Sequence, residues 1–401
     1  MSKRIISFSP PDVGEHEINN IIEVLKSGWI TTGPQTKLFE RLIANYCNTE
    51  KAVCLNSATA CLELILRLFG IGVGDEVITT AYTYTASASV IAHVGAKIIL
   101  VDTLPGSYEI DYDSVSRVIT SKTKAIIAVD IAGRLCDYER LNNIIANAKH
   151  LFHTSHKFQE IIGSKIVLIA DAAHSFGGVR DNLISGQLAD FTSFSFHAVK
   201  NLTTGEGGAL TWKALPISSE IIYKQFMLMS LHGQSKDALS KSQLGAWEYD
   251  IQDTYYKCNM TDIMAAIGIS QIERFPELLK RRKNIIESYN AGFRSTPIHP
   301  LEHFIKGNSS GAHLYLTRVE GVNEYMRNEI IVKLSDRGIA CNVHYKPLPM
   351  HTAYKNLGFD IKDFPNAYSQ YAQEITLPLH TLLTDADIEY IITEYRRITS
   401  V

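Results

Sequence analysis

Short runs of apolar, often β-branched residues alternate with longer amphipathic stretches through about the first 260 residues of the chain. Several of these runs are almost continuously aliphatic, a pattern typical of strands buried on both faces of a sheet. The stretches between them, such as 58–69 and 139–146, have helical spacing. This alternation predicts an α/β domain with a mostly parallel, seven-stranded sheet that helices cover on both sides. The expected strands are 52–55, 76–79, 97–101, 124–129, 165–170, 191–196 and 208–211.

The pattern changes near residue 261. A long helical stretch is expected over 261–294, interrupted near Pro276, and strand-like and helical segments follow it. We therefore predict a large domain over 1–260 and a smaller C-terminal α+β domain over 261–401. The two should share a wide interface, because no low-complexity linker separates them. The smaller domain is expected to contain strands at 313–319 and 340–343, and helices at 324–336, 367–373 and 385–399.

Composition and charge exclude several partners and locations. The 401 residues carry a formal net charge of −3, so no basic field gathers nucleic acid. The apolar runs are too short to span a bilayer, and the start at Met1-Ser2-Lys3-Arg4 lacks the apolar region of a signal peptide. Six scattered cysteines without a C-x-x-C motif are typical of reduced thiols. We expect a cytoplasmic enzyme with no metal, because the three histidines of segment 150–164 suit one ion poorly at helical spacing.

A lysine at the end of the strand within segment 190–208 is the first candidate for chemistry. Alternate residues of a strand share a face, so Ser193, Ser195 and His197 should point to one side. Lys200 follows where the strand ends and a glycine-rich loop begins. There its amine could be desolvated and kept reactive as a Schiff-base nucleophile. The alternative is an ordinary exposed lysine at a strand end.

An acid ends another buried strand, at Asp171. A carboxylate in such a place is costly unless it is paired. The protonated ring nitrogen of pyridoxal phosphate (PLP) is one such partner, and an Asp in PLP enzymes keeps that nitrogen charged. His174, three residues further on, could then reach the phenolic oxygen of the ring. The alternative for Asp171 is a helix N-cap.

A third segment predicts a phosphate site. The strand ending at Leu55 runs into a helix whose first amides have no internal partners and favour an anion. Ser57 and Thr59 add hydroxyl groups beside the amide of Ala58. Downstream, Tyr84 could cover one face of a flat ring, although tyrosines in such a stretch are more often core residues.

Two glycine patterns argue against a nicotinamide cofactor. The glycines of segment 70–74 precede a strand when the dinucleotide fingerprint requires that they follow one. Those of segment 205–208 have neither the fingerprint's spacing nor a following helix. An oxidoreductase of that type is therefore disfavoured.

Taken together, these segments resemble the DegT/DnrJ/StrS family of sugar aminotransferases, which have the type I fold of PLP enzymes. The resemblance covers nearly the whole chain and depends on the order and spacing of several motifs. The motifs are Gly28-Trp29-Ile30-Thr31-Thr32-Gly33-Pro34, Asn56-Ser57-Ala58-Thr59-Ala60, Asp171-Ala172-Ala173-His174, the stretch from Ser195 through His197 and Lys200 to Gly208, Val343-His344-Tyr345-Lys346-Pro347-Leu348, and Leu377-Pro378-Leu379.

The resemblance implies roles for individual residues. Lys200 would hold PLP and shuttle the proton between sugar and cofactor, Asp171 would pair with the ring nitrogen, and His174 would lie near the phenolic oxygen. Tyr84 would cover the ring. The phosphate would be held by Ser57, the Ala58 amide, Thr59 and Ser195.

The resemblance also implies a homodimer, in which Asn259 crosses the interface to the active site of the neighbouring chain. Weaker candidates for contacts with the sugar or its diphosphate are Thr32, His197, His344 and Lys346.

The implied reaction has two halves. Glutamate converts PLP to its amine form (PMP), which then aminates the ketone of a UDP- or dTDP-linked deoxy-sugar. The segment around Asn259 favours C-4 of the sugar over C-3, and bacterial surface polysaccharide synthesis is the expected setting. The alternative from another class is a relative that holds PLP without catalysis and serves as a regulatory or binding protein.

Overall fold

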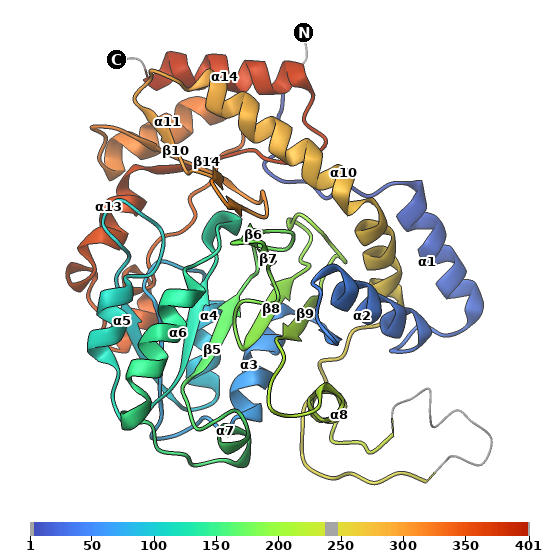
Figure 1. The fold of residues 1–401 in the computed structure, drawn as a ribbon. Helices are drawn as coiled ribbons and strands as arrows, with labels where there is room; N and C mark the ends of the chain where they lie inside the picture. The colour runs from blue at the N-terminus through green and yellow to red at the C-terminus, as the bar shows by residue number, and fades with distance from the viewer. Residues whose placement is uncertain (1–3, 237–247, 400–401) are drawn as a thin grey trace.

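A seven-stranded sheet forms the centre of the larger part of the molecule (Figure 1). The computed structural model describes residues 4–236 and 248–399. Strand β9, next to the edge strand β1, is antiparallel to both of its neighbours, and the other four pairings are parallel. The predicted mostly parallel sheet is therefore confirmed. In spatial order the strands are β1 (Ala52–Leu55), β9 (Gly208–Trp212), β8 (Phe191–Ser195), β5 (Val167–Asp171), β4 (Thr123–Val129), β2 (Glu76–Thr80) and β3 (Lys97–Val101).

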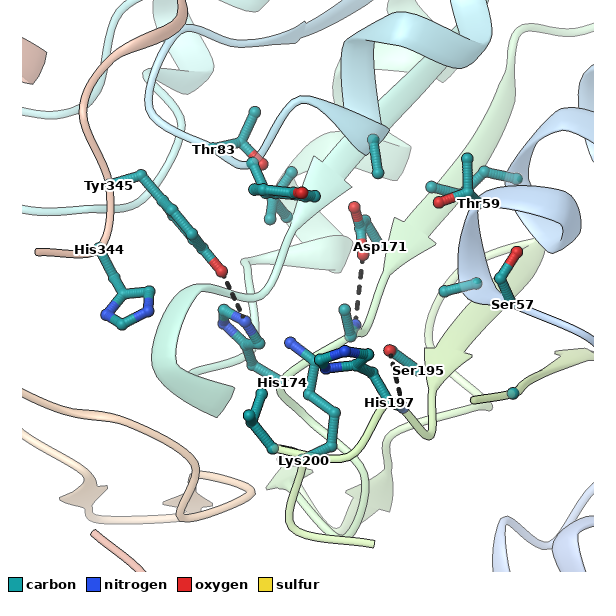
Figure 2. Close-up of a pocket in the computed structure, with 18 of the residues that line it drawn as sticks. Ser57, Thr59, Thr83, Asp171, His174, Ser195, His197, Lys200, His344 and Tyr345 are labelled. Carbon is teal, nitrogen blue, oxygen red and sulfur yellow. Dashed lines mark hydrogen bonds between the residues drawn. The ribbon is translucent and has the colours of Figure 1, made fainter. Parts of the chain in front are cut away.

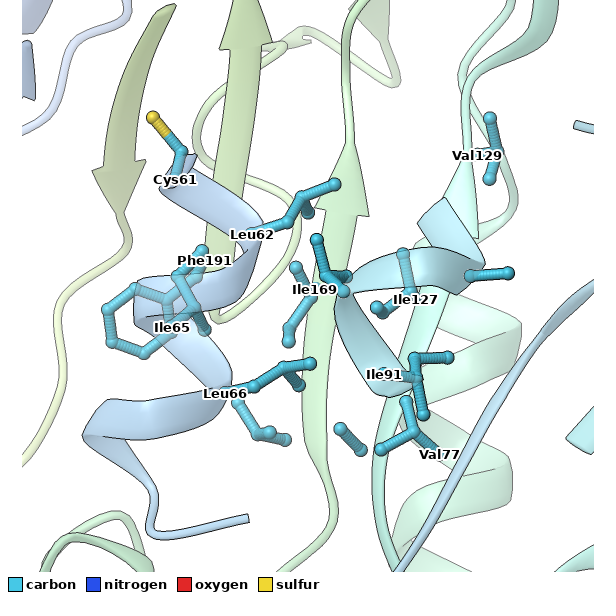
Figure 3. Packing of buried hydrophobic residues seen from close by; sticks show 14 of the residues in the cluster. Cys61, Leu62, Ile65, Leu66, Val77, Ile91, Ile127, Val129, Ile169 and Phe191 are labelled. Carbon is cyan, nitrogen blue, oxygen red and sulfur yellow. The ribbon is translucent and has the colours of Figure 1, made fainter. Parts of the chain in front are cut away.

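Helices cover both faces of this sheet, as the two-sided apolar strands require. Ile127 of β4 faces Leu62, Ile65 and Leu66 of one helix, as Figure 3 shows, whereas its neighbour Ile126 belongs to the core on the opposite face. Two separate cores thus lie on the two sides of one sheet. The helices of this part are α2 (Pro34–Tyr46), α3 (Ala58–Leu68), α4 (Ala86–His93), α5 (Tyr112–Val118), α6 (Tyr138–Asn147), α7 (Lys157–Ile161) and α8 (Ser219–Ser230).

A second, three-stranded antiparallel sheet lies at the other end of the molecule (Figure 1). It consists of β10 (Ile298–Pro300), β13 (Tyr315–Val319) and β14 (Glu374–Leu377). With α11 (Glu324–Asp336) and α14 (Asp385–Thr399) it encloses a third core. Helix α13 (Pro365–Gln373) instead places Ala367 and Tyr371 in the core that contains Ile127. The α+β character expected after residue 261 is present, and the boundary at residue 260 stays a prediction.

The start of the chain belongs to this third core. Ile6 is buried in it, and its backbone N–H donates to the carbonyl of Gly338 at 2.7 Å. The N–H of Ala340 donates back to Ile6 at 3.1 Å, and Arg4 forms an ion pair with Asp387 of α14 at 2.5 Å. Segments from the two ends of the sequence are therefore hydrogen-bonded to each other.

Helix α10 (Asp262–Gly292) runs between the two parts and packs against α1 (Glu15–Ser27) and α2. The interruption predicted near Pro276 is wrong, because the helix continues through the proline. One missing N–H within 31 residues is outweighed by packing along the rest of the helix. The strand predicted at 340–343 is also wrong: its backbone alternates between two partners, Ile6 and Thr376, and forms only isolated bridges.

Shorter elements complete the described chain. In segment 150–164, which carries three histidines, His156 caps α7 and Phe158 joins a core, so this segment is partly internal. All six cysteines are free thiols. Within residues 4–236 and 248–399, no helix is both long enough and apolar enough to cross a membrane. The remaining elements are β6 (Val179–Arg180), β7 (Leu183–Ile184), β11 (Phe304–Ile305), β12 (Asn308–Ser309), α12 (Thr352–Asn356), and short 3-10 turns at Ile131–Gly133, Lys149–Leu151, Leu348–Met350 and Ile361–Asp363.

Candidate active site

A cavity of about 350 Å³ opens where β5 and β8 end and α3 begins (Figure 2). The carboxyl ends of parallel strands are where α/β sheets bind ligands. One segment of the small C-terminal part completes its wall with the adjacent residues His344 and Tyr345. The structure brings most of the predicted site residues together here, and these are Ser57, Ala58, Thr59, Tyr84, Asp171, His174, Ser195, His197, Lys200 and His344.

Lys200 extends into the middle of this cavity. Its side chain points between His174 and Asp171 in Figure 2, and its backbone N–H donates to the carbonyl of His197 at 2.9 Å. Burial lowers the pKa of the Lys200 amine to about 8, although the nearby Asp171 carboxylate acts in the opposite direction. About a tenth of the amine is therefore unprotonated at pH 7, and this fraction can act as a nucleophile.

Asp171 ends β5 at the bottom of the cavity, with only 6% of its surface exposed. Burial raises the pKa of its carboxyl, while hydrogen bonds and the Lys200 ammonium oppose that rise. Ser87 donates to Oδ2 at 2.7 Å, and the N–H of Ala173 donates to Oδ1 at 3.2 Å. Thr83 in turn shares a hydrogen bond of 2.8 Å with Ser87. The carboxylate is thus oriented, yet it lacks a full counter-charge at its buried position.

The tautomer of His174 follows from its partners. The backbone N–H of Ala132 donates to Nδ1 at 3.2 Å, so Nδ1 carries no proton and Nε2 carries one. Nε2 lies 3.0 Å from the hydroxyl of Tyr345. Burial lowers the pKa of the imidazole well below its usual range, and Lys200 lowers it further. His174 therefore offers a neutral N–H donor, and the left-handed backbone of Ala132 (φ 54°) aims the amide that fixes it.

The first turn of α3 provides a cradle for an anion. Ser57 caps the helix, because its hydroxyl accepts from the N–H of Ala60 at 3.1 Å. Gly208 of β9 passes so close that a Cβ on it would lie 2.4 Å from the Ala58 nitrogen. Ser195 faces the same region from β8 (Figure 2). The cap interpretation and the phosphate interpretation are compatible, since Ala58 and Thr59 still border the cavity.

Tyr84 and His197 lie at the rim of the cavity. Tyr84 is 60% exposed, so the core interpretation of this tyrosine is wrong. Its ring centroid lies 5.9 Å from that of Tyr345. Nε2 of His197 lies 3.6 Å from a carboxylate oxygen of Glu206, and both side chains are largely exposed. Both are therefore accessible to a substrate.

Three predicted residues do not line the cavity of their own chain. The amide of Asn259 donates to the hydroxyl of Thr32 at 2.5 Å, and that hydroxyl donates to the carbonyl of Met260 at 2.5 Å. Lys346 is exposed next to the cavity wall. The roles assigned to these three residues stay predictions.

Sequence reasoning missed several residues that the fold brings to the site. Ser87 lies in the first turn of α4 and Thr83 lies just before the helix, and neither position points to Asp171 in the sequence. Tyr345 belonged to a recognised motif without being assigned a contact. Ala132 acts through its backbone, so its residue type carried no signal.

The residues present fit PLP. The cavity combines a cradle of hydroxyl groups and amides for a phosphate, a buried carboxylate without a full counter-charge, and an amine with a pKa of about 8. A phosphorylated ring with a basic nitrogen and an aldehyde satisfies all three at once.

Comparison with known proteins gives the class. The profile of the DegT/DnrJ/EryC1/StrS aminotransferase family matches residues 11–396, so the chain belongs to this family. The putative sugar aminotransferase Spr1654 of Streptococcus pneumoniae, in its PMP form, is 54% identical, with 98% of this chain and 99% of that chain covered and a TM-score of 0.96. Its PLP form has a TM-score of 0.95, with 52% identity and 99% of each chain covered.

Two curated relatives extend the comparison. The uncharacterised protein MJ1066 of Methanocaldococcus jannaschii is 38% identical, with 98% of both chains covered. The spore coat polysaccharide biosynthesis protein SpsC of Bacillus subtilis is 34% identical, with 98% of this chain and 97% of SpsC covered. The predicted family, fold, enzyme class and PLP cofactor are thereby confirmed.

Proposed function

We propose that the protein transfers an amino group from glutamate to the ketone of a UDP- or dTDP-linked deoxy-sugar, at C-4, in the cytoplasm of a bacterium that builds a surface polysaccharide or glycan. The observation that carries this proposal is the convergence of Lys200 and Asp171 on one cavity beside the cradle at α3. The spore coat polysaccharide role named for SpsC supports the setting.

The chain's own residues have distinct roles in this reaction. PLP, when bound, supplies an electron-accepting ring that stabilises negative charge on the reacting carbon. Lys200 holds the cofactor and then takes and returns the proton at that carbon. Asp171 keeps the ring nitrogen protonated, and His174 donates its Nε2 hydrogen toward the phenolic oxygen.

Binding and orientation fall to the residues around the rim. The phosphate is held by Ser57, the Ala58 amide, Thr59 and Ser195, whose convergence at the first turn of α3 supports this assignment. Tyr84 covers the ring from the open side. The substrate contacts proposed are Thr32, His197, His344 and Lys346.

A panel of substrates tests the proposal. Purified protein with PLP and glutamate is incubated with UDP- and dTDP-linked 4-keto and 3-keto deoxy-sugars, and the products are analysed by NMR. We expect amination at C-4; amination at C-3 would correct the position. A visible spectrum of the bound PLP that glutamate leaves unchanged would favour the regulatory alternative.

Lys200→Ala should abolish turnover and the absorption of lysine-bound PLP, whereas Lys122→Ala, at an exposed lysine, serves as the control. Full activity in Lys200→Ala would refute the mechanism.

The homodimer is a separate part of the proposal. Asn259 does not line its own chain's cavity, which agrees with a contact to a second copy. Asn259→Ala and Lys200→Ala should each be impaired alone. In a mixed dimer one site keeps both residues, so random mixing should restore about a quarter of wild-type activity. No recovery in verified mixed dimers would contradict the exchange of Asn259.

A further inference from the structure

A chain of three hydrogen-bonded side chains leads from the cavity into the core of the small C-terminal part. Nδ1 of His344 lies 2.9 Å from the hydroxyl of Thr376, which lies 2.5 Å from Oε1 of Glu374. Thr376 and Glu374 are alternate residues of β14 and share a face of the strand. The His344 segment is held alongside the edge of β14, because the N–H of Asn342 donates to the carbonyl of Thr376 at 3.1 Å.

The other oxygen of Glu374 is fixed as an acceptor. The backbone N–H of His344 donates to Oε2 at 2.8 Å, and this bond cannot reverse. Protonation of the carboxyl therefore occurs at Oε1, on the side of Thr376. The single hydroxyl hydrogen of Thr376 points to Glu374 when the carboxyl is ionised and to His344 when it is protonated. The proton of His344 accordingly lies on Nδ1 in the first case and on Nε2 in the second.

The cavity end of the chain is held in place. His344 lines the cavity, its carbonyl accepts from the hydroxyl of Tyr82 at 2.8 Å, and its ring stacks on Phe8 with centroids 5.6 Å apart. Within the described part of the chain, no protein group is hydrogen-bonded to Nε2. Burial, and then the charge of Lys200, lowers the pKa of His344 to about 3, so the ring cannot store a proton as a cation near neutral pH.

Glu374 is suited to store that proton. Its side chain is fully buried, and burial raises its pKa to about 8 against the opposing effects of Thr376, the His344 amide and Arg327. The guanidinium of Arg327 donates to the backbone carbonyls of Glu374 and Tyr371. The other titratable groups that interact with this carboxylate stay neutral because burial raises their pKa, and they are Tyr82, Tyr108, Cys341, Tyr345 and Tyr395.

We propose that Glu374, Thr376 and His344 form a proton relay through which His344 Nε2 exchanges a proton with the substrate while the imidazole stays neutral. During amination the ketone oxygen leaves as water and must gain protons. Nε2 gives one proton to this oxygen, Nδ1 takes the hydrogen of Thr376, and Thr376 takes the proton of Glu374. The relay is reset when Nε2 accepts a proton from the ammonium group of the amino donor and the shifts run backwards. This proposal rests on the proposed function only in taking the ketone to be that of a sugar.

Spectroscopy tests the relay without any substrate. In infrared difference spectra of the PLP-bound enzyme, the carbonyl band of a protonated carboxyl should disappear with a midpoint near pH 8 and be missing in Glu374→Gln. In ¹⁵N spectra of histidine-labelled enzyme, assigned by His344→Gln, Nε2 should change from the protonated to the unprotonated type over the same range. A His344 tautomer that does not change while Glu374 titrates would overturn the proposal.

Kinetics on matched variants tests whether the relay serves the reaction. Thr376→Val removes the connecting hydroxyl, and Thr376→Ser restores it. Thr317→Val is the control, because Thr317 is a buried hydroxyl residue of the adjacent strand that does not contact His344. Loss of a general acid–base path lowers rates by about a hundredfold or more.

We expect that loss of kcat in Thr376→Val, near-normal rates in Thr376→Ser and Thr317→Val, and little change in KM. The glutamate half-reaction alone should show the loss, so an incorrect sugar would not be mistaken for a failed relay. Wild-type single-turnover rates in Thr376→Val would overturn the relay.

Discussion

Ser87 provides the sharpest test of how Asp171 is kept ionised. Its hydroxyl donates to Oδ2 at 2.7 Å, and Ser87 itself is fully buried. Ser87→Ala removes this donor and leaves only the bond from the Ala173 amide, which is longer at 3.2 Å. A hydrogen bond to a charged group contributes about 1.5–3 kcal/mol, which corresponds to about a tenfold to hundredfold change in affinity.

The assay is titration of the apoprotein with PMP, which binds without a covalent bond to Lys200. We expect the affinity for PMP to fall by about tenfold to a hundredfold in Ser87→Ala, because the variant holds the charged ring nitrogen less well. Thr83→Val is the matched control. It removes only the partner of Ser87 and leaves the bond to Asp171, so its effect should stay within about fivefold.

The pH dependence separates this explanation from general damage to the fold. Ser87 lowers the pKa of Asp171 against burial, so the variant carboxyl is protonated at higher pH than in the wild type. The deficit in PMP affinity should therefore grow as the pH falls. In folded Ser87→Ala, the pKa of Asp171 then lies further above its value in the unfolded chain. The loss of unfolding free energy of the variant apoprotein, relative to wild type, should therefore grow as the pH rises. Equal PMP affinity in Ser87→Ala and wild type would refute the reasoning. So would losses of PMP affinity and of unfolding free energy that change in the same direction with pH.

Three further predictions concern the cradle, a helix cap and the lysine. Gly208→Ala should lower both the melting temperature and the affinity for PMP. The new Cβ would lie 2.4 Å from the Ala58 nitrogen and must displace the start of α3. An unchanged affinity for the phosphate group would contradict the proposal that the first turn of α3 binds it. Asp262→Ala should destabilise the protein by about 2–4 kcal/mol in urea unfolding. The buried carboxylate of Asp262 caps α2 by accepting from the amides of Gly33 and Thr36 at 2.8 and 2.9 Å. A loss of less than about 0.5 kcal/mol, the size expected of a surface substitution, would contradict this role. The rate at which the apoprotein binds PLP covalently should rise about tenfold per pH unit up to about pH 8 and level off above it, because only the unprotonated Lys200 amine attacks. Stopped-flow rates that stay constant from pH 6 to about 8 would show that this amine is not the titrating group.

The elements predicted best were the strands whose hydrophobic pattern directly indicates burial. The strands from Ala52–Leu55 to Gly208–Trp212 are apolar on both faces, so their positions could be found without knowledge of their neighbours. Segment 340–343 was misassigned because an apolar pattern cannot show that a segment has two different partners on its two sides. The continuity of α10 through Pro276 depends on contacts with α1 and α2 that are remote in sequence.

The same distinction applies to the site. Lys200, Asp171 and Ser57 stand at strand ends or helix starts, where local sequence already places a functional group. Ser87 reaches Asp171 only because α4 begins beside the end of β5, and the relay from His344 depends on the register of β14. Such contacts are tertiary, so no local pattern carries them. The role of Asn259 needs a second copy of the chain.

The pairing of Ile6 with Gly338 and Ala340 has a consequence for biosynthesis. When the amino terminus leaves the ribosome, its hydrogen-bonding partners have not yet been translated, and they stay absent until synthesis is almost complete. The larger sheet can assemble during translation, but the C-terminal core must wait for both ends of the polypeptide. Deleting the first eight residues, or fusing a bulky tag directly to them, should therefore impair maturation of the opposite end of the protein.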